Sequence, residues 1–215
     1  MKKILLVIVI ILVLTTGLIY YLYTRISYTP DWYDKGQFAV DKEMITQSKG
    51  TEESITAELI RNKRTVVNAE DLTAFILEEV HRQIPEESDQ VMKALRCEVE
   101  GGQVLIESVI NLDEIPLKKL SPTQQNAVKK LLGSFPEDSR QNFYIGISGR
   151  PVLNDERIEL GPEAKVQLGK MKYPLNSILA QISGKNQPAT FVPLNKFPFK
   201  NFHIEGDKII LENED

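Results

Sequence analysis

The stretch that decides the fold is residues 95–112, LRCEVEGGQVLIESVINL, in which apolar and polar side chains alternate on both sides of a glycine pair. Gly101 and Gly102 allow the positive φ values of a primed turn, so the pattern predicts an antiparallel hairpin. Alternation places Leu95, Cys97 and Val99 on one face, and Val104, Ile106, Ile110 and Leu112 on another. One face of the sheet is therefore buried, and Cys97 is predicted to be a small core residue rather than a nucleophile.

Helix and strand signals surround this hairpin. Asn68 is a typical helix-capping residue, and the apolar spacing after it predicts an amphipathic helix from about Ala69 to Gln83. The other predicted helices begin at Thr51, run from Ser121 to Leu132, and run from Tyr173 through Ile182. The other predicted β segments are a β-rich fragment at 65–68, strands at 142–149, 157–160 and 165–169, and a closing hairpin at 202–212. A turn-rich stretch is predicted at 149–155. This order predicts an α+β fold with a curved, mainly antiparallel sheet packed on helices.

A second informative stretch runs from Ile4 to Tyr23 (ILLVIVIILVLTTGLIYYLY) and contains no charge. Twenty helical residues at about 1.5 Å each span roughly 30 Å, the thickness of a bilayer core. Lys2 and Lys3 precede the run and only Arg25 follows it closely, which favours an amino terminus inside the cytoplasm. The sequence thus predicts a single-pass anchor in the cell membrane with the carboxyl-terminal domain outside the cytoplasm. A cleaved signal peptide is the alternative, but the run is too long and lacks an Ala-x-Ala site.

Residues 1–25 are thus the predicted cytoplasmic tip and anchor, residues 26–64 a juxtamembrane arm with a short helix, and residues 65–215 an extracytoplasmic domain. The arm contains Tyr28, Trp32 and Tyr33, whose rings with one polar end are typical of the headgroup layer. They predict an interfacial belt, with a docking motif above the bilayer as the alternative. The sequence leaves open whether the arm packs onto the domain.

Composition argues against several classes of site. The chain has 26 basic and 30 acidic residues, and the part after Arg25 has a net charge of about −7, which disfavours nucleic-acid binding. The single cysteine cannot form an internal disulfide. His81 and His203 have no Cys or His neighbours at ligand spacing, so we predict no metal site and no cofactor. His203 is expected on the surface of a strand.

Catalytic motifs are also absent from the sequence. The segment Gly146-Ile147-Ser148-Gly149 is one residue short of a nucleophile elbow and precedes a proline turn rather than a helix. The paired carboxylates, such as Asp113-Glu114, lie in loop-like stretches where solvation is the ordinary explanation. We therefore predict that the protein is not an enzyme.

Short phrases suggest a family. VVNAEDLTAFI (66–76), the Ile115-Pro116 pair, LGKMKYPLNSIL (168–179) and the terminal hairpin follow a membrane anchor. In this order they resemble bacterial anchored proteins of the YpmS-like kind and the tubular lipid-binding (TULIP-like) half-barrels of the cell envelope, over about residues 65–215. The resemblance implies a helix cradled by a curved sheet, with an apolar groove for acyl chains. The helix predicted from Ser121 to Leu132 departs from the usual strand order of such domains.

A lipid groove needs apolar side chains that a ligand can reach. The candidate lining residues are Leu72, Phe75, Ile106, Ile110, Ile145, Ile147, Leu175, Ile178 and Leu179. Any α+β domain would bury the same positions. Two functions remain: binding of a lipid or another amphiphile, or an anchored protein-interaction or assembly module of a cell-envelope complex. The second would use a sheet edge or the Trp32 region to hold an envelope protein partner.

Overall fold

The predicted glycine hairpin is present and joins β2 (Met92–Glu100) to β3 (Gln103–Ile110). Gly101 and Gly102 have φ values of 58° and 77°, as a primed turn requires. Cys97 pairs directly with Ile106, so both lie on the same face, and the prediction of different faces is wrong. The second strand is also shorter than predicted, because Leu112 begins a 3-10 turn, η1 (Leu112–Glu114).

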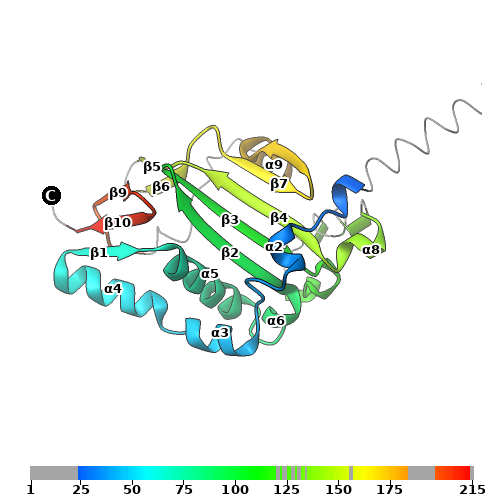
Figure 1. Cartoon of the computed structure of the whole chain (residues 1–215), viewed down its shortest axis with the longest axis horizontal. Coiled ribbons are helices and arrows are strands. Elements are labelled where there is room, and N and C mark those ends of the chain that lie inside the picture. Colours follow the sequence, from blue (N-terminus) through cyan, green and yellow to red (C-terminus); the bar gives the residue numbers. More distant parts are fainter. Residues whose placement is uncertain are drawn as a thin grey trace, which may run out of the picture.

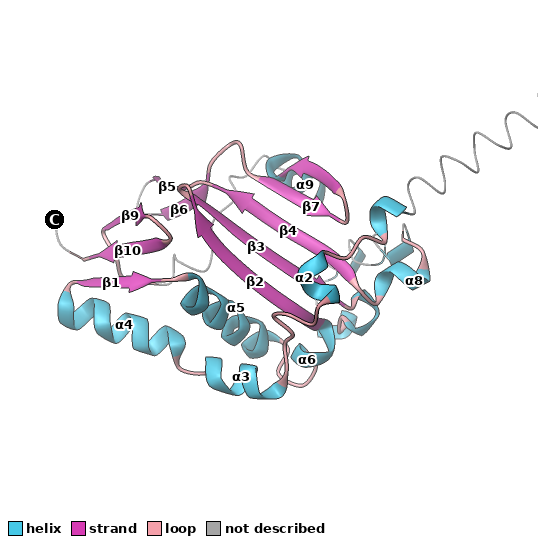
Figure 2. Ribbon diagram, in the orientation of Figure 1, coloured by secondary structure: helices cyan, strands magenta, loops and turns pink. Residues whose placement is uncertain are grey.

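Three more strands extend this hairpin into a five-stranded antiparallel sheet with the order β2-β3-β4-β7-β8 (Figure 1). The added strands are β4 (Phe143–Gly149), β7 (Lys165–Leu168) and β8 (Met171–Pro174). The computed structural model describes residues 24–119, 122, 125–126, 129, 132–133, 135–154, 157–183 and 197–213. Within these residues the fold is α+β, with antiparallel sheets packed on helices as predicted (Figure 2).

Helix α5 (Ala69–Gln83) lies against β2 and occupies the residues predicted for it. Its start is fixed by a capping box, in which Asn68 accepts from the Asp71 amide and Asp71 accepts from the Asn68 amide. Leu72 and Phe75 are buried in the main core cluster, and Leu77 joins a second cluster with Leu95. The apolar stripe of α5 therefore covers the face of the sheet that carries Leu95 and Cys97.

A smaller sheet brings the ends of the domain together. It has the order β1-β10-β9, formed by β1 (Arg64–Val67), β10 (Lys208–Glu212) and β9 (Asn201–Glu205). The β9–β10 turn contains Gly206 with a φ of 64°, which confirms the predicted closing hairpin, and His203 is exposed on β9 as predicted. Val67, Ile209 and Leu211 are buried in the main core, so this sheet is packed against the rest of the domain.

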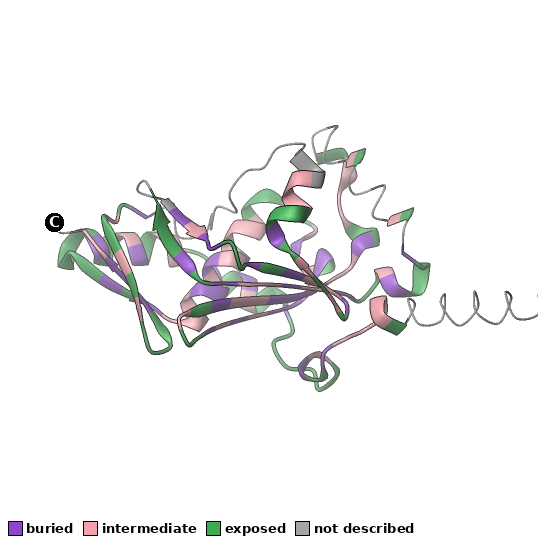
Figure 3. Ribbon diagram, turned by 90° about the horizontal axis from the view of Figure 1, so that it is seen from above, coloured by how far each residue is buried: buried purple, intermediate pink, exposed green. Residues whose placement is uncertain are grey.

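Most of residues 26–64 also pack onto the domain, which answers the question that the sequence left open. The helices here are α2 (Asp31–Asp34), α3 (Lys42–Ser48) and α4 (Thr51–Asn62). Ile45 packs with Leu77 and Leu95, and Ile55 and Leu59 join the main core. Buried residues, drawn in purple, occur in helices as well as in strands (Figure 3).

Residues 24–40, which we call the strap, cross the face of the sheet opposite to α5. Trp32 is 9% exposed and packs with Ala94, Val109 and Tyr144, whose side chains alternate away from the α5 face. The interfacial-belt prediction is therefore wrong for Trp32, since its ring is covered by the protein itself. The strap ends by pairing with the edge of β2: the Val40 amide donates to the Lys93 carbonyl over 2.9 Å.

Two local predictions differ from the structure. The stretch expected to be turn-rich forms β5 (Pro151–Asn154), which pairs with β6 (Arg157–Leu160) in a separate two-stranded sheet. The last long helix, α9 (Leu175–Ser183), begins two residues later than predicted. Tyr173 and Pro174 belong to edge strand β8 instead, where a residue without an amide hydrogen is tolerated.

Two other predictions concern residues that the structure does not describe. The predicted anchor, residues 4–23, lies outside the described residues, and so does most of the helix predicted for 121–132. Among the residues that are described, no helix combines the length and the apolar character that a membrane crossing needs.

Candidate ligand pocket

The nine residues predicted to line a groove are buried or half-buried in hydrophobic clusters of the fold. Leu72, Phe75 and Leu175 are buried in the main cluster, and Ile110 packs in a separate cluster around Phe143. The remaining five, Ile106, Ile145, Ile147, Ile178 and Leu179, are half-buried against the main cluster. None of the nine lines either of the two pockets described below.

The first pocket lies between α3, α5 and β2 and has a volume of about 380 Å³, within the usual range for small-molecule sites. We call it the α3–α5 pocket. Its walls are mostly apolar, and Glu70 is the one charged residue among those that line it. The lining residues are Phe38, Met44, Gln47, Ser48, Ala69, Glu70, Thr73, Ala74, Leu77 and Cys97.

Small side chains on α5 and caps on both helices create this space. Ala69, Thr73 and Ala74 come from one side of α5, where larger residues would fill the gap to α3. Asp41 caps α3 by accepting from the Met44 amide over 2.8 Å, which fixes the start of that helix beside the pocket. The pocket is therefore a product of helix packing and not of a flexible loop.

Phe38 stands at the pocket in a costly backbone conformation. Its φ is 58°, which is rare for a bulky residue, and its side chain is 46% exposed. The Phe38 carbonyl accepts from the Leu95 amide over 3.1 Å, so the strained residue is held on the edge of β2. Its ring also packs edge-on against Trp32, with centroids 5.9 Å apart, and lies 5.5 Å from the Arg96 guanidinium carbon. These contacts hold Phe38 at the edge of β2, beside the pocket.

Cys97 lines the same pocket from β2 and is 6% exposed, as the alternation of the hairpin predicted. Burial raises the pKa of its thiol to about 11, and a hydrogen bond with Thr73 acts in the opposite direction. The thiol is therefore neutral at pH 7 and is a poor nucleophile there. Its contribution to the pocket is a small, weakly polar wall.

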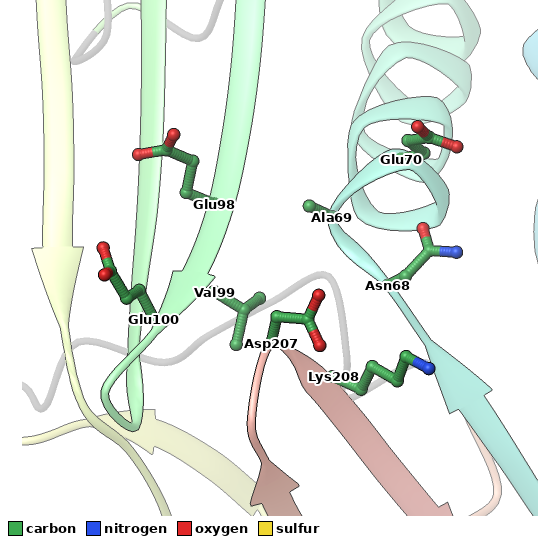
Figure 4. A pocket seen from close by; sticks show the side chains of 8 residues that line it. All are labelled: Asn68, Ala69, Glu70, Glu98, Val99, Glu100, Asp207 and Lys208. Atoms are coloured by element: carbon green, nitrogen blue, oxygen red, sulfur yellow. The ribbon is translucent and has the colours of Figure 1, made fainter.

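A second pocket adjoins the first at the amino-terminal end of α5 (Figure 4). This acidic cleft, about 590 Å³ in volume, shares Ala69 and Glu70 with the α3–α5 pocket. Its other lining residues are Asn68, Glu98, Val99, Glu100, Asp207 and Lys208. In the described parts of the chain, no group of three or more histidine, cysteine or acidic residues is placed to hold a metal ion.

A partly buried polar cluster lies on the strap side of the sheet. The Tyr144 hydroxyl donates to Glu107, and the Arg96 guanidinium donates to Glu107 over 3.4 Å and to Glu98. Burial, followed by the hydrogen bond to Glu107, raises the pKa of Tyr144, so its phenol is neutral across the physiological range. Trp32 covers this face, and its indole Nε1 is buried with no hydrogen-bond partner. The cluster packs on the strap face of the sheet, and its member Glu98 also lines the acidic cleft.

The α3–α5 pocket was not predicted from the sequence, because two of its walls, Phe38 and α3, come from the segment interpreted as a connecting arm. One available signal was the run of small residues on α5, since Ala69, Thr73 and Ala74 share a side at helical spacing. Comparisons with protein-family models, with curated proteins and with solved structures found no match to this chain.

Proposed function

We propose that the protein is a single-pass, membrane-anchored protein of the cell envelope whose non-enzymatic domain binds the apolar part of a lipid or another amphiphile in the α3–α5 pocket. The observation that carries this proposal is the pocket itself, an apolar space of about 380 Å³ with Glu70 as the one charged residue among those lining it. Water in such a space gains few hydrogen bonds, so its replacement by a hydrocarbon chain is favourable.

The anchor is proposed from the uncharged run from Ile4 to Tyr23 and the lysines before it. An anchored domain works at a surface made of amphiphiles, which supplies ligands of the chemistry that the pocket suits. The resemblance to YpmS-like and TULIP-like proteins remains a proposal, supported by an antiparallel sheet with α5 against one face. In this proposal the ligand lies beside α5 at the edge of β2, and eight of the nine predicted residues belong to the main core cluster or pack against it.

Native mass spectrometry of the full-length protein, released from detergent, tests the proposal directly. We expect a bound lipid in the wild type and its loss in Ala74→Phe, because the new ring fills the pocket. Ala57→Phe is the matched control, since Ala57 is exposed on α4 and lines neither described pocket. A wild type without bound lipid, or equal lipid binding in all three proteins, would show that the pocket is not the site.

A second candidate function is the anchored protein-interaction module. It is favoured by Val152 and Leu153, each 39% exposed on β5, whose two-stranded sheet does not pair with the other sheets within the described residues. The Trp32 region is covered by the domain and offers less for a partner than these strands. A photo-crosslinker at residue 152 in membranes would give a discrete protein adduct under this function, and only lipid or solvent adducts under the first.

A further inference from the structure

The chain is fastened to the domain almost as soon as the proposed anchor ends at Tyr23. The Arg25 carbonyl accepts from the Lys170 amide, in the β7–β8 turn, over 2.7 Å. Gly169 permits this approach because it has a φ of 58° and no side chain. A Cβ atom there would overlap the Arg25 carbonyl oxygen and lie 2.9 Å from that of Ile26. Arg25 and the turn are therefore in direct backbone contact.

Further contacts attach residues 25–34 of the strap to the domain, so this segment is not a free stalk. Ser27 and Ser139 hydroxyls lie 2.6 Å apart, and the Tyr33 hydroxyl donates to Asn142 over 2.8 Å. Tyr28 packs edge-on against Tyr144, with ring centroids 5.6 Å apart, and the Lys170 ammonium lies 5.1 Å from the Tyr28 centroid. These contacts therefore fix the orientation of the domain relative to the residues that follow the proposed anchor.

Geometry then limits how far the β7–β8 turn can lie from the bilayer. Arg25 is the second residue after Tyr23. Two extended residues reach at most about 7 Å. This distance is shorter than the Debye length of about 8 Å at physiological ionic strength. The turn is Gly169-Lys170, and β8 follows with Met171 and Lys172. Both lysines are exposed and the methionine is half-buried.

We infer that the β7–β8 turn and the start of β8 form a membrane-contact surface, in which Lys170 and Lys172 face anionic phospholipid headgroups and hold the domain in one orientation on the bilayer. The inference rests on the proposed anchor, but not on the pocket. Lysines near an anionic surface are attracted to it, whereas acidic side chains are repelled. Glu137 and Asp138 are exposed on α8 (Glu137–Arg140), next to Ser139, whose hydroxyl contacts that of Ser27. Their negative charges limit the membrane contact to the turn rather than to the whole end of the domain.

The test uses the full-length chain, with Cys97→Ala to remove the native thiol, in vesicles of phosphatidylcholine and phosphatidylglycerol. A nitroxide label at Lys172→Cys reports on the start of β8, next to the turn, and leaves Lys170 in place for the contact with anionic lipid. The matched control is Asp207→Cys, an exposed position in the β9–β10 turn, near the carboxyl-terminal end of the domain and away from the strap's start (Figure 1). We expect the label at residue 172 to collide several-fold less with a water-soluble nickel complex than the label at residue 207, and to lose this protection in vesicles of phosphatidylcholine alone.

Three other outcomes would overturn the inference, and they are distinguishable. Equal nickel accessibility at both positions, in protein that stays with the vesicles after an alkaline wash, refutes the contact and leaves the anchor intact. Protection at residue 172 that persists without anionic lipid refutes the role of the lysines. Release of the protein by the alkaline wash refutes the proposed anchor and the contact together.

Discussion

Gly169→Ala should weaken the junction between the strap and the sheet by more than an ordinary glycine substitution would. An alanine with positive φ is destabilised by about 1–2 kcal/mol relative to glycine, whatever its surroundings. At Gly169 the new methyl group also displaces Arg25, because it would overlap a backbone oxygen that cannot rotate away. The hydrogen bond from the Lys170 amide is then lost, which is worth about 0.5–1.5 kcal/mol.

Gly206→Ala is the matched control for this variant. Gly206 has nearly the same φ, 64° against 58°, but nothing lies within 4 Å of a Cβ atom built there. Both variants share the conformational penalty, so the clash and the lost hydrogen bond should make Gly169→Ala less stable by about 1 kcal/mol, or about fivefold in the unfolding equilibrium.

Urea unfolding of the full-length protein in detergent measures this difference, and hydrogen exchange locates it. In Gly169→Ala, the peptide covering residues 25–33 should exchange faster than in the wild type, and in Gly206→Ala it should not. Equal unfolding free energies together with unchanged exchange of the strap would refute the reasoning, since the backbone contact would then contribute nothing to stability.

Two further predictions concern titratable groups. The pKa of Cys97 is raised to about 11 from an ordinary 9.0, which lowers its thiolate fraction at pH 8 about 100-fold. Maleimide should therefore modify Cys97 far more slowly in the folded protein than in the urea-unfolded chain. Bound amphiphile should slow this modification further. Equal rates in the two states would contradict the burial of this thiol. Tyr144 has a raised folded pKa, so its stabilising effect is complete below pH 10 and is lost at higher pH, by up to about 1.4 kcal/mol per pH unit. The unfolding free energy of wild type should therefore fall more steeply above pH 10 than that of Tyr144→Phe, and parallel pH profiles would contradict this assignment.

The sequence predicted those elements whose signals are local. The Gly101-Gly102 hairpin needs only period-two alternation and a turn that glycine allows, and α5 needs only a cap at Asn68 and an apolar stripe. Neither depends on a distant part of the chain. Pro151 and Pro174 misled the prediction because proline is also frequent in turns and at helix starts, whereas both residues here lie in strands β5 and β8.

The pocket and the packing of the strap on the sheet could not be predicted in the same way, because both depend on long-range contacts. Tyr28, Trp32 and Tyr33 have the composition of an interfacial belt, and only contact with the sheet distinguishes the two environments. A signal was nevertheless present on the strap side of the hairpin. Ala94 and Val109 are apolar at positions that alternation assigns to the uncovered face, which indicates that another segment covers them.

The strap links the two proposed sites, since the segment that leaves the proposed anchor also builds part of the pocket. It contacts the β7–β8 turn at Arg25, packs Trp32 on the sheet, and then places Phe38 and α3 at the pocket. A fragment that began at residue 65 would therefore lack two pocket walls and expose the apolar strap face of the sheet. Ligand binding and attachment to the membrane should for this reason be studied in the full-length chain, because the residues between the anchor and β1 contribute to both.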